Sequence, residues 1–287
     1  MVQKKSKNKV SLAHGRPPSS RGGIHKSMSA KATRTLIRSH HQLHKALAEA
    51  EKNGNQGKIE SLRQQIELQG GLKRYQQASL QGQAIDRGGD SSKVLLDWMN
   101  PLLAESKTEL RLLEVGALSA TNACSRSGLF SVTRIDLHSQ AKGIQQQDFM
   151  ERPLPKSNEE RFAVISLSLV VNYVPELVGR GEMLRRTCQF MNVEQQIQNG
   201  ERQVTPALFL VLPAPCIFNS RYMDETRLTE IMQSLGYHLE ERKLTSKLIY
   251  YLWSYSATRS DRRPHAAFAK KETNPGANRN NFSIVLE

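Results

Sequence analysis

The sequence predicts an α/β fold in which helices cover a mostly parallel β-sheet. From Leu110 onward, short apolar segments alternate with polar or helical stretches, as in repeated strand–helix–strand units. The first four segments are continuous apolar runs, which is typical of parallel strands buried on both faces. The last two are separated only by a short turn near Thr245-Ser246, so they are expected to pair antiparallel.

The expected strands follow one another in chain order. They are Arg111–Val115, Ser131–Leu137, Arg161–Ser166, Ala207–Leu212, Tyr237–Leu244 and Leu248–Ser254. After Tyr255 the composition becomes polar and basic, so residues 256–280 are expected to form a loop or a partly ordered tail. The apolar run Phe282–Leu286 is compatible with one further short strand.

Three helices are expected before the first strand. Residues 29–50 carry apolar side chains at roughly helical spacing, and residues 58–69 do the same after a break rich in Asn and Gly. These two helices are expected to form a hairpin. A third helix is predicted over residues 91–104, with Ser91 and Ser92 as candidate N-caps.

The positive charge is concentrated at the N-terminus. The chain has 41 basic and 27 acidic residues, a net charge of +14, but residues 1–45 hold eleven Lys or Arg and no Asp or Glu. The remainder has 41 − 11 = 30 basic and 27 acidic residues, or +3. Such an arm suits a polyanion, because neutralising phosphates releases counterions. The alternative is a solvated tail that only targets or solubilises the protein.

Several classes of protein are not expected. There is no apolar run long enough for a membrane span and no apolar region behind the N-terminal lysines, so neither a transmembrane helix nor a secretory signal is predicted. The three cysteines, Cys124, Cys188 and Cys216, form no CxxC pair and are expected to be free thiols. His40 and His44 have a spacing that can hold a metal, but without an HExxH pattern no metal site is predicted.

The first expected strand leads into a turn of small residues, Gly116-Ala117-Leu118-Ser119. A strand, such a turn and a helix form a ligand crevice at the carboxyl end of a parallel sheet. Gly116 would let the backbone approach a ligand closely. The turn lacks a full GxGxxG, so a dinucleotide is not favoured.

Two further acidic residues, Asp136 and Asp148, come at the end of the second expected strand and in the loop that follows it. Asp136 ends the following strand, twenty residues after Gly116, where a carboxylate can accept hydrogen bonds from ribose hydroxyls. In the next loop, Asp148 is a candidate to bind the amino group of an adenine, and Phe149 to cover its ring. A turn or a cap is the alternative for each of these residues taken alone.

A fourth feature follows the third expected strand. In Asn172-Tyr173-Val174-Pro175, an amide can read a base edge and a tyrosine ring can stack on a flipped base. Many nucleic-acid base methyltransferases carry an Asn/Asp-Pro-Pro-aromatic segment at this place. The alternative is an apolar helix start with a structural Asn and Tyr.

Five segments together resemble one known family: Leu113–Ser119, Arg134–Leu137, Gln147–Phe149, Ser168–Pro175 and Leu212–Tyr222. They are similar to the fungal nucleolar large-subunit (25S) rRNA adenine-N(1)-methyltransferases, which are related to the animal S-adenosylmethionine sensor of the TOR pathway. The resemblance covers roughly residues 30–255. It implies a Rossmann-like class I S-adenosylmethionine-dependent methyltransferase fold, with a mostly parallel seven-stranded sheet, an antiparallel last hairpin and preceding N-terminal helices.

The resemblance also implies that Gly116 and Asp136 contact S-adenosylmethionine and that the protein modifies rRNA in the nucleolus during ribosome biogenesis. We expect Asp148 and Phe149 to hold the cofactor adenine, and Asn172 and Tyr173 to be the catalytic residues that orient the target base. Free large-subunit rRNA and a pre-ribosomal particle both remain open as the partner, as does the oligomeric state. The rival functions are a non-catalytic S-adenosylmethionine sensor that acts through a protein partner, and a methyltransferase for small molecules or proteins.

The expected organisation has four parts: a disordered basic tail over residues 1–28, a helical region over 29–90, a methyltransferase domain over 91–255 and a C-terminal extension over 256–287.

Overall fold

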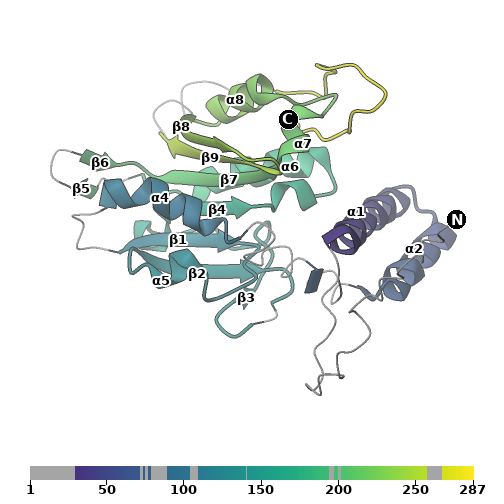
Figure 1. Ribbon diagram of the computed structural model, residues 1–287, viewed down its shortest axis with the longest axis horizontal. Coiled ribbons are helices and arrows are strands. Elements are labelled where there is room, and N and C mark those ends of the chain that lie inside the picture. Colours follow the sequence, from purple (N-terminus) through teal and green to yellow (C-terminus); the bar gives the residue numbers. More distant parts are fainter. Residues whose placement is uncertain are drawn as a thin grey trace, which may run out of the picture.

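A computed structural model describes residues 30–71, 74, 77–78, 89–103, 109–139, 141–193, 197–199, 202–256 and 267–287. At its centre is a seven-stranded sheet with the order β3-β2-β1-β4-β7-β9-β8 (Figure 1). Its strands are β1 (Leu110–Val115), β2 (Phe130–Asp136), β3 (Gln145–Gln146), β4 (Val164–Ser168), β7 (Ala207–Pro213), β8 (Tyr237–Leu244) and β9 (Leu248–Tyr255). The first five in spatial order are parallel, and β9 is antiparallel to both of its neighbours.

This order confirms the expected fold class, a mostly parallel sheet with an antiparallel last hairpin. All six expected strands are present, with bounds that differ by up to three residues. Three short strands were missed. The two residues of β3 are both exposed glutamines, and β5 (Ile197–Asn199) and β6 (Arg202–Val204) form a separate two-stranded sheet. Strands this short have no periodicity that the sequence can reveal.

The helices lie on both faces of the sheet and beyond its edge (Figure 1). They are α1 (Ala30–Lys52), α2 (Gln56–Leu68), α4 (Ser92–Leu103), α5 (Ala123–Arg126), α6 (Leu177–Phe190), α7 (Ala214–Phe218) and α8 (Glu225–Ser234), with the 3-10 turns η2 (Asn158–Glu160) and η3 (Val171–Tyr173). The expected helices at residues 29–50, 58–69 and 91–104 correspond to α1, α2 and α4.

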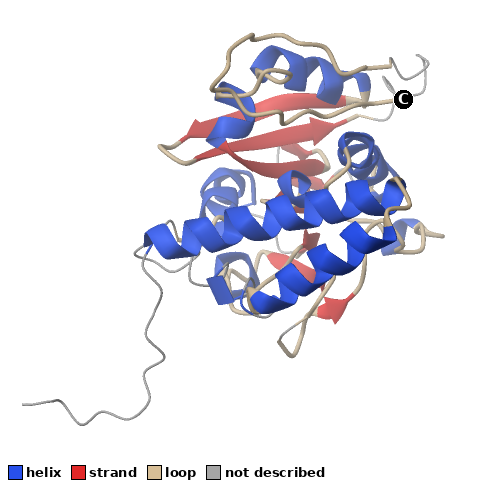
Figure 2. Cartoon of the chain, turned by 90° about the vertical axis from the view of Figure 1, so that its right-hand side faces the viewer, coloured by secondary structure: helices blue, strands red, loops and turns tan. Residues whose placement is uncertain are grey.

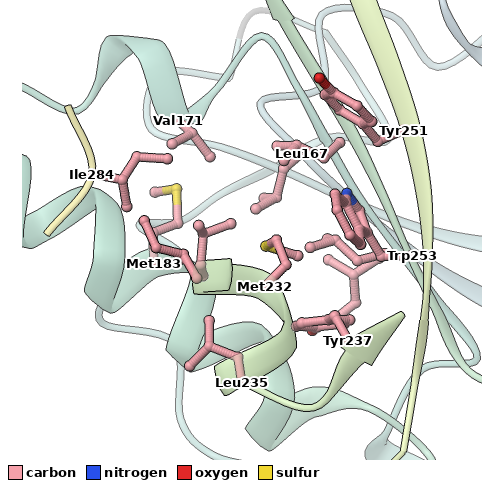
Figure 3. Packing of buried hydrophobic residues seen from close by; sticks show 14 of the residues in the cluster. Leu167, Val171, Met183, Met232, Leu235, Tyr237, Tyr251, Trp253 and Ile284 are labelled. Carbon is pink, nitrogen blue, oxygen red and sulfur yellow. The ribbon is translucent and has the colours of Figure 1, made fainter. Parts of the chain in front are cut away.

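Two hydrophobic clusters sandwich the sheet, because side chains of a strand point alternately to its two faces. Leu112 packs with α4 on one face, whereas Leu113 belongs to the larger cluster on the other face. The larger cluster includes residues of α6 and α8 and the paired aromatic rings of Tyr251 and Trp253 on β9 (Figure 3). Burial on both faces explains why the central strands β1, β4 and β7 are largely apolar, whereas β2 and β3 towards the edge include polar and exposed residues.

The C-terminal segment differs from its prediction. Residues 282–286 are all buried, and Ile284 and Leu286 belong to the larger cluster. The segment does not join the sheet as a strand. It makes an isolated bridge between Leu286 and Phe268, accepts a hydrogen bond from Ser220 in the loop after α7, and lies against α6. Its apolar side chains are therefore explained by packing on a helix rather than by strand pairing.

The helices α1 and α2 form the expected hairpin and pack through a small cluster around Ala50, Ile59 and Leu62. Both views place this hairpin beyond the edge at which the parallel strands end (Figures 1 and 2). The expected tail over residues 1–28 lies outside the described part of the chain. Among the described residues, no helix has the length and apolar character needed to span a membrane.

Candidate functional site

The register of the parallel strands brings the predicted residues to one edge of the sheet. Val115 pairs with Ile135 on one side and with Leu167 on the other, and Asp136 pairs with Gln146. Gly116, Asp136, Asp148 and the segment after Ser168 therefore all leave the sheet at its carboxyl edge. In an open α/β sheet this edge, at the point where the strand order reverses, is where ligands bind.

The turn after β1 is shaped by Gly116. Its φ of 74° lies in the left-handed region that favours glycine. Its amide and that of Ala117 both donate to the carbonyl oxygen of Ile135, at 2.9 and 3.1 Å, which ties the turn to the end of β2. A Cβ atom at Gly116 would come within 2.8 Å of Val170 Cγ2. The turn is thus packed directly against the segment that follows β4.

Glu114, near the end of β1, links the strand before this turn to the start of α5. Its Oε1 accepts a hydrogen bond of 2.7 Å from Asn122 Nδ2, and Asn122 caps α5 by accepting from the amide of Ser125. The other carboxylate oxygen, Oε2, is buried without a partner among the described residues. Burial raises the pKa of Glu114 to about 7. The hydrogen bond to the α5 cap gives Glu114 a supporting role beneath the turn.

The two aspartates occupy adjacent loops at this edge. Asp136 accepts the amide of His138 at 2.8 Å, and burial raises the pKa of Asp136, in opposition to that hydrogen bond. Asp148 accepts the amide of Met150 at 2.7 Å. In each case the carboxylate accepts an amide of its own loop and so stabilises that loop, which lies at the carboxyl edge of the sheet.

Phe149 is placed differently from its prediction. Its ring is 2% exposed and belongs to the larger core cluster, with its centroid 5.4 Å from that of Phe190. Arg186 donates to the Phe149 carbonyl oxygen at 2.8 Å from the outside. A ring so deeply packed has almost no surface with which to cover an adenine. Its position indicates that Phe149 anchors the Asp148 loop to the core.

The segment after β4 carries the two predicted catalytic residues in the turn η3. Leu169 has a φ of 60°, the one non-glycine residue with a positive φ among those described. Such strain is characteristic of functional sites. Asn172 Oδ1 is buried without a hydrogen-bond partner in the described part of the chain, whereas buried polar atoms are normally paired. Tyr173 is half-buried next to it.

The sequence did not predict that Asp90 and Ser91, just before α4, are hydrogen-bonded to residues at the same edge of the sheet. Asp90 Oδ2 accepts the amide of Ala123, at the start of α5, at 2.6 Å, and Asp90 Oδ1 accepts the amide of Ser92. Ser91 Oγ lies 2.8 Å from Ser168 Oγ at the end of β4. Ser91 and Ser92 were expected to cap a helix. Ser91 directly precedes α4, and the two serines also link this helix to β4 and to α5, where Ser92 Oγ accepts the amide of Cys124.

The cysteines and histidines in the described part of the chain form neither a disulfide nor a metal-binding group. The three cysteines are free, as expected, and burial raises the pKa of each thiol, to about 11 for Cys188 and about 12 for Cys124 and Cys216. The rings of His40 and His44 lie 4.3 Å apart. No group of three or more metal-ligand side chains exists among the described residues.

These features fit a small polar ligand with a flat base. The turn at Gly116 has no room for a Cβ atom beside Val170, two carboxylates lie along the same edge, and two buried oxygens, Asn172 Oδ1 and Glu114 Oε2, are without partners among the residues that the structure describes.

Comparison with known proteins identifies the family. Residues 60–284 match the family model of Bmt2, the 25S rRNA (adenine(2142)-N(1))-methyltransferase. The chain belongs to this family. The Bmt2 family match includes the whole carboxyl edge of the sheet and most of the buried C-terminal segment.

Two curated relatives support membership in the Bmt2 family. The 25S rRNA adenine-N(1) methyltransferase of Schizosaccharomyces pombe is 42% identical over 219 residues, covering 75% of this chain and 76% of that protein. The 25S rRNA (adenine(2142)-N(1))-methyltransferase of Saccharomyces cerevisiae is 38% identical over 224 residues, covering 77% of this chain and 62% of that protein.

Among solved structures, the 16S rRNA methylase RmtB has a TM-score of 0.43 at 13% identity, covering 78% of this chain and 98% of that one. This similarity is too low to support an argument, and the fold is assigned from the strand order of the sheet.

Proposed function

We propose that the protein is an S-adenosyl-L-methionine-dependent methyltransferase that methylates N1 of an adenine in 25S rRNA. Membership in the Bmt2 family is the observation that carries this proposal. The geometry supports it, because the tight turn at Gly116 and Asn172 Oδ1, which has no hydrogen-bond partner among the described residues, lie at one edge of the sheet.

Each residue at the edge has a proposed role. The turn at Gly116 holds the methionine part of the cofactor, Asp136 binds its ribose hydroxyls, and Asp148 binds its adenine amino group. Asn172 orients the target adenine through its Oδ1, which can accept a hydrogen bond from the exocyclic amino group of that base. Tyr173 stacks on the base.

The reaction needs little proton chemistry from the protein. When bound, S-adenosyl-L-methionine supplies an electrophilic methyl group. N1 of neutral adenine carries a lone pair and no proton, so no general base is required to create the nucleophile. The task of the chain is therefore to hold the base and the cofactor close and aligned. Because N1 lies on the Watson–Crick edge, a paired adenine must first be exposed.

The basic arm and the α1–α2 hairpin are proposed to bind the rRNA. Residues 1–45 hold eleven basic and no acidic side chains, and α1 is placed beside the carboxyl edge of the sheet (Figure 2). Binding to phosphates in this way gives affinity without sequence specificity, so the fold of the rRNA or pre-ribosomal particle supplies the choice of adenine. A protein with this substrate acts in ribosome biogenesis, and we infer that it does so in the nucleus, within the nucleolus.

The deciding experiment supplies the purified protein with methyl-labelled S-adenosyl-L-methionine and unmodified 25S rRNA. The expected product is labelled 1-methyladenine at one position after digestion of the rRNA. Tight cofactor binding without any transfer, to free rRNA or to pre-ribosomal particles, would favour a cofactor sensor instead.

A further inference from the structure

Arg180, near the start of α6, donates to three main-chain carbonyl oxygens. Its Nε donates to Val174 at 2.9 Å, its Nη2 to Pro175 at 3.4 Å, and its Nη1 to Ser283 at 2.7 Å. The first two carbonyls belong to the segment that follows η3, and the third belongs to the C-terminal segment. One guanidinium group thus joins the end of the chain to the segment that carries Asn172 and Tyr173.

The side chain is almost fully enclosed. Arg180 is 8% exposed, and its guanidinium carbon lies 4.6 Å from the centroid of the Phe282 ring. It forms no salt bridge among the described residues, and burial lowers its pKa. Burying a cation is costly unless its donors are satisfied. An arginine kept at this cost, with carbonyl acceptors on two separate segments, acts as a cross-link.

The C-terminal strap, defined as residues 280–287, is held at both ends of its path. At one end, Asn280 donates to Asn219 and accepts from Arg221, and Phe282 accepts from Ser220 Oγ at 2.6 Å. These partners lie in the loop after α7, which follows the end of β7.

At its other end the strap lies on the start of α6. Val285 donates to the carbonyl oxygen of Leu177 at 3.1 Å, and a Cβ atom at Gly181 would come within 1.9 Å of the Val285 carbonyl oxygen. Ile284 packs beside Val171 of η3 and Met183 of α6 (Figure 3). The strap thus packs against the apolar side of η3, and Arg180 holds the main chain of the two residues that directly follow η3.

We propose that Arg180 is a positioning residue which, together with the C-terminal strap, fixes the Asn172–Tyr173 turn in the orientation that presents the target adenine. The inference rests on the proposed function of that turn. Since a planar guanidinium satisfies three carbonyls at once, neither lysine nor a neutral side chain can reproduce the clamp. Its loss lets the turn shift, and a misplacement of about 1 Å can reduce a reaction rate by roughly a hundredfold.

The test compares Arg180→Lys, Arg180→Met and Phe282→Leu in the full-length chain. The matched control is Arg161→Lys, because Arg161 also donates to two main-chain carbonyls, at 2.7 Å to Gln189 and 3.5 Å to Met191, but at the opposite end of α6. We measure the single-turnover rate of methyl transfer, KM for 25S rRNA, and cofactor affinity by calorimetry. The rate for the Arg180 variants should fall roughly ten- to a hundredfold, with cofactor affinity and KM changed by less than about twofold.

A second measurement does not depend on activity. Amide hydrogen exchange should accelerate at residues 169–176 in both Arg180 variants and stay unchanged at residues 114–122, which form the cofactor turn. Phe282→Leu, the mildest variant, should give a smaller change in the same direction.

The outcomes are distinct. Variants that lose stability but keep the wild-type rate and the wild-type exchange at residues 169–176 would overturn the proposal, as would an equal loss of rate in Arg161→Lys. A wild-type protein that transfers no methyl group would refute the proposed function instead, and the exchange experiment would still decide whether Arg180 holds the turn.

Discussion

Gly116 lies so close to Val170 that a Cβ atom on the glycine would come within 2.8 Å of Val170 Cγ2. The turn after β1 and the segment after β4 are thereby packed against each other. The first is proposed to hold the cofactor and the second to present the base, so this close approach sets the distance between the two reactants.

Substitution of Gly116 should abolish or weaken cofactor binding. Gly116→Arg places a long side chain in this tight turn and should leave no measurable affinity for the cofactor. Gly116→Ala should lower the cofactor affinity roughly tenfold or more, which corresponds to about 1.4 kcal/mol. Gly128→Ala is the control, since Gly128 has a similar φ of 70° but nothing within 4 Å of an added Cβ. Both alanines should destabilise the fold by about 1 kcal/mol through φ strain, and Gly116→Ala should destabilise it further because its Cβ meets Val170. Equal cofactor affinity for Gly116→Arg and wild type in a calorimetric titration would refute the placement.

Replacing Asn172 should abolish methyl transfer without lowering the stability of the fold. Its Oδ1 is buried without a partner among the described residues, and an unsatisfied buried polar group costs about 1–3 kcal/mol. Asn172→Leu, which keeps a similar volume, should therefore leave the free energy of unfolding unchanged or raise it by about 1 kcal/mol. Methyl transfer should be lost, while cofactor affinity remains.

The control for this substitution is Asn100→Leu on the exposed side of α4. It should affect neither transfer nor affinity. A fully active Asn172→Leu protein would show that the amide does not orient the base.

Glu114 should make the stability depend on pH. Its pKa rises from 4.5 in the reference state to about 7 in the folded protein, mainly because it is buried. The folded state holds this proton more tightly than the unfolded state, so the stabilisation is complete below pH 4.5 and is lost as the pH rises through about 7. The difference amounts to about 3 kcal/mol.

Glu114→Gln removes this titration and keeps an acceptor for Asn122. Urea denaturation should show the variant more stable than wild type at about pH 8 and nearly equal at about pH 4. Glu109→Gln, at an exposed position just before β1, is the control and should behave like wild type at both pH values. A constant difference across this range would contradict the assignment to Glu114.

Deletion of residues 1–28 should weaken rRNA binding without changing cofactor affinity. The segment holds seven basic residues and no acidic ones. For every phosphate that the shortened chain no longer neutralises, the slope of log affinity against log salt should fall by about 0.7 to 0.9. Filter binding over a range of salt concentrations measures this slope. An unchanged slope would mean that the arm serves only to target or solubilise the protein.

Much of the fold follows from local patterns. Apolar runs predicted β1, β4 and β7, a more polar segment predicted β2, and the turn near Thr245 predicted the antiparallel hairpin. The two-residue strand β3 and the strands β5 and β6 could not be found, because exposed, polar and very short strands have no periodicity of their own.

The candidate site was predicted less completely. The sequence predicted that Gly116, Asp136 and Asp148 lie at one edge of a parallel sheet, and the strand register places them there; their roles in binding the cofactor are proposals. Phe149 was read as a ring over the cofactor, and only tertiary packing shows that it faces Phe190 in the core. Asp90 and Ser91 were missed as members of the site, because their partners Ala123 and Ser168 are distant in sequence.

By itself, the sequence determined the strand–helix alternation, the glycine turn, the carboxylates at the strand ends and the basic arm, since each depends on neighbouring residues or on composition. Only the tertiary structure decided that Val170 abuts Gly116, that Asn172 Oδ1 lacks a partner among the described residues and that Arg180 ties the C-terminal strap to the segment after η3. The physical reason is that these relationships join residues on different strands and helices. They exist only after the sheet has brought those elements together.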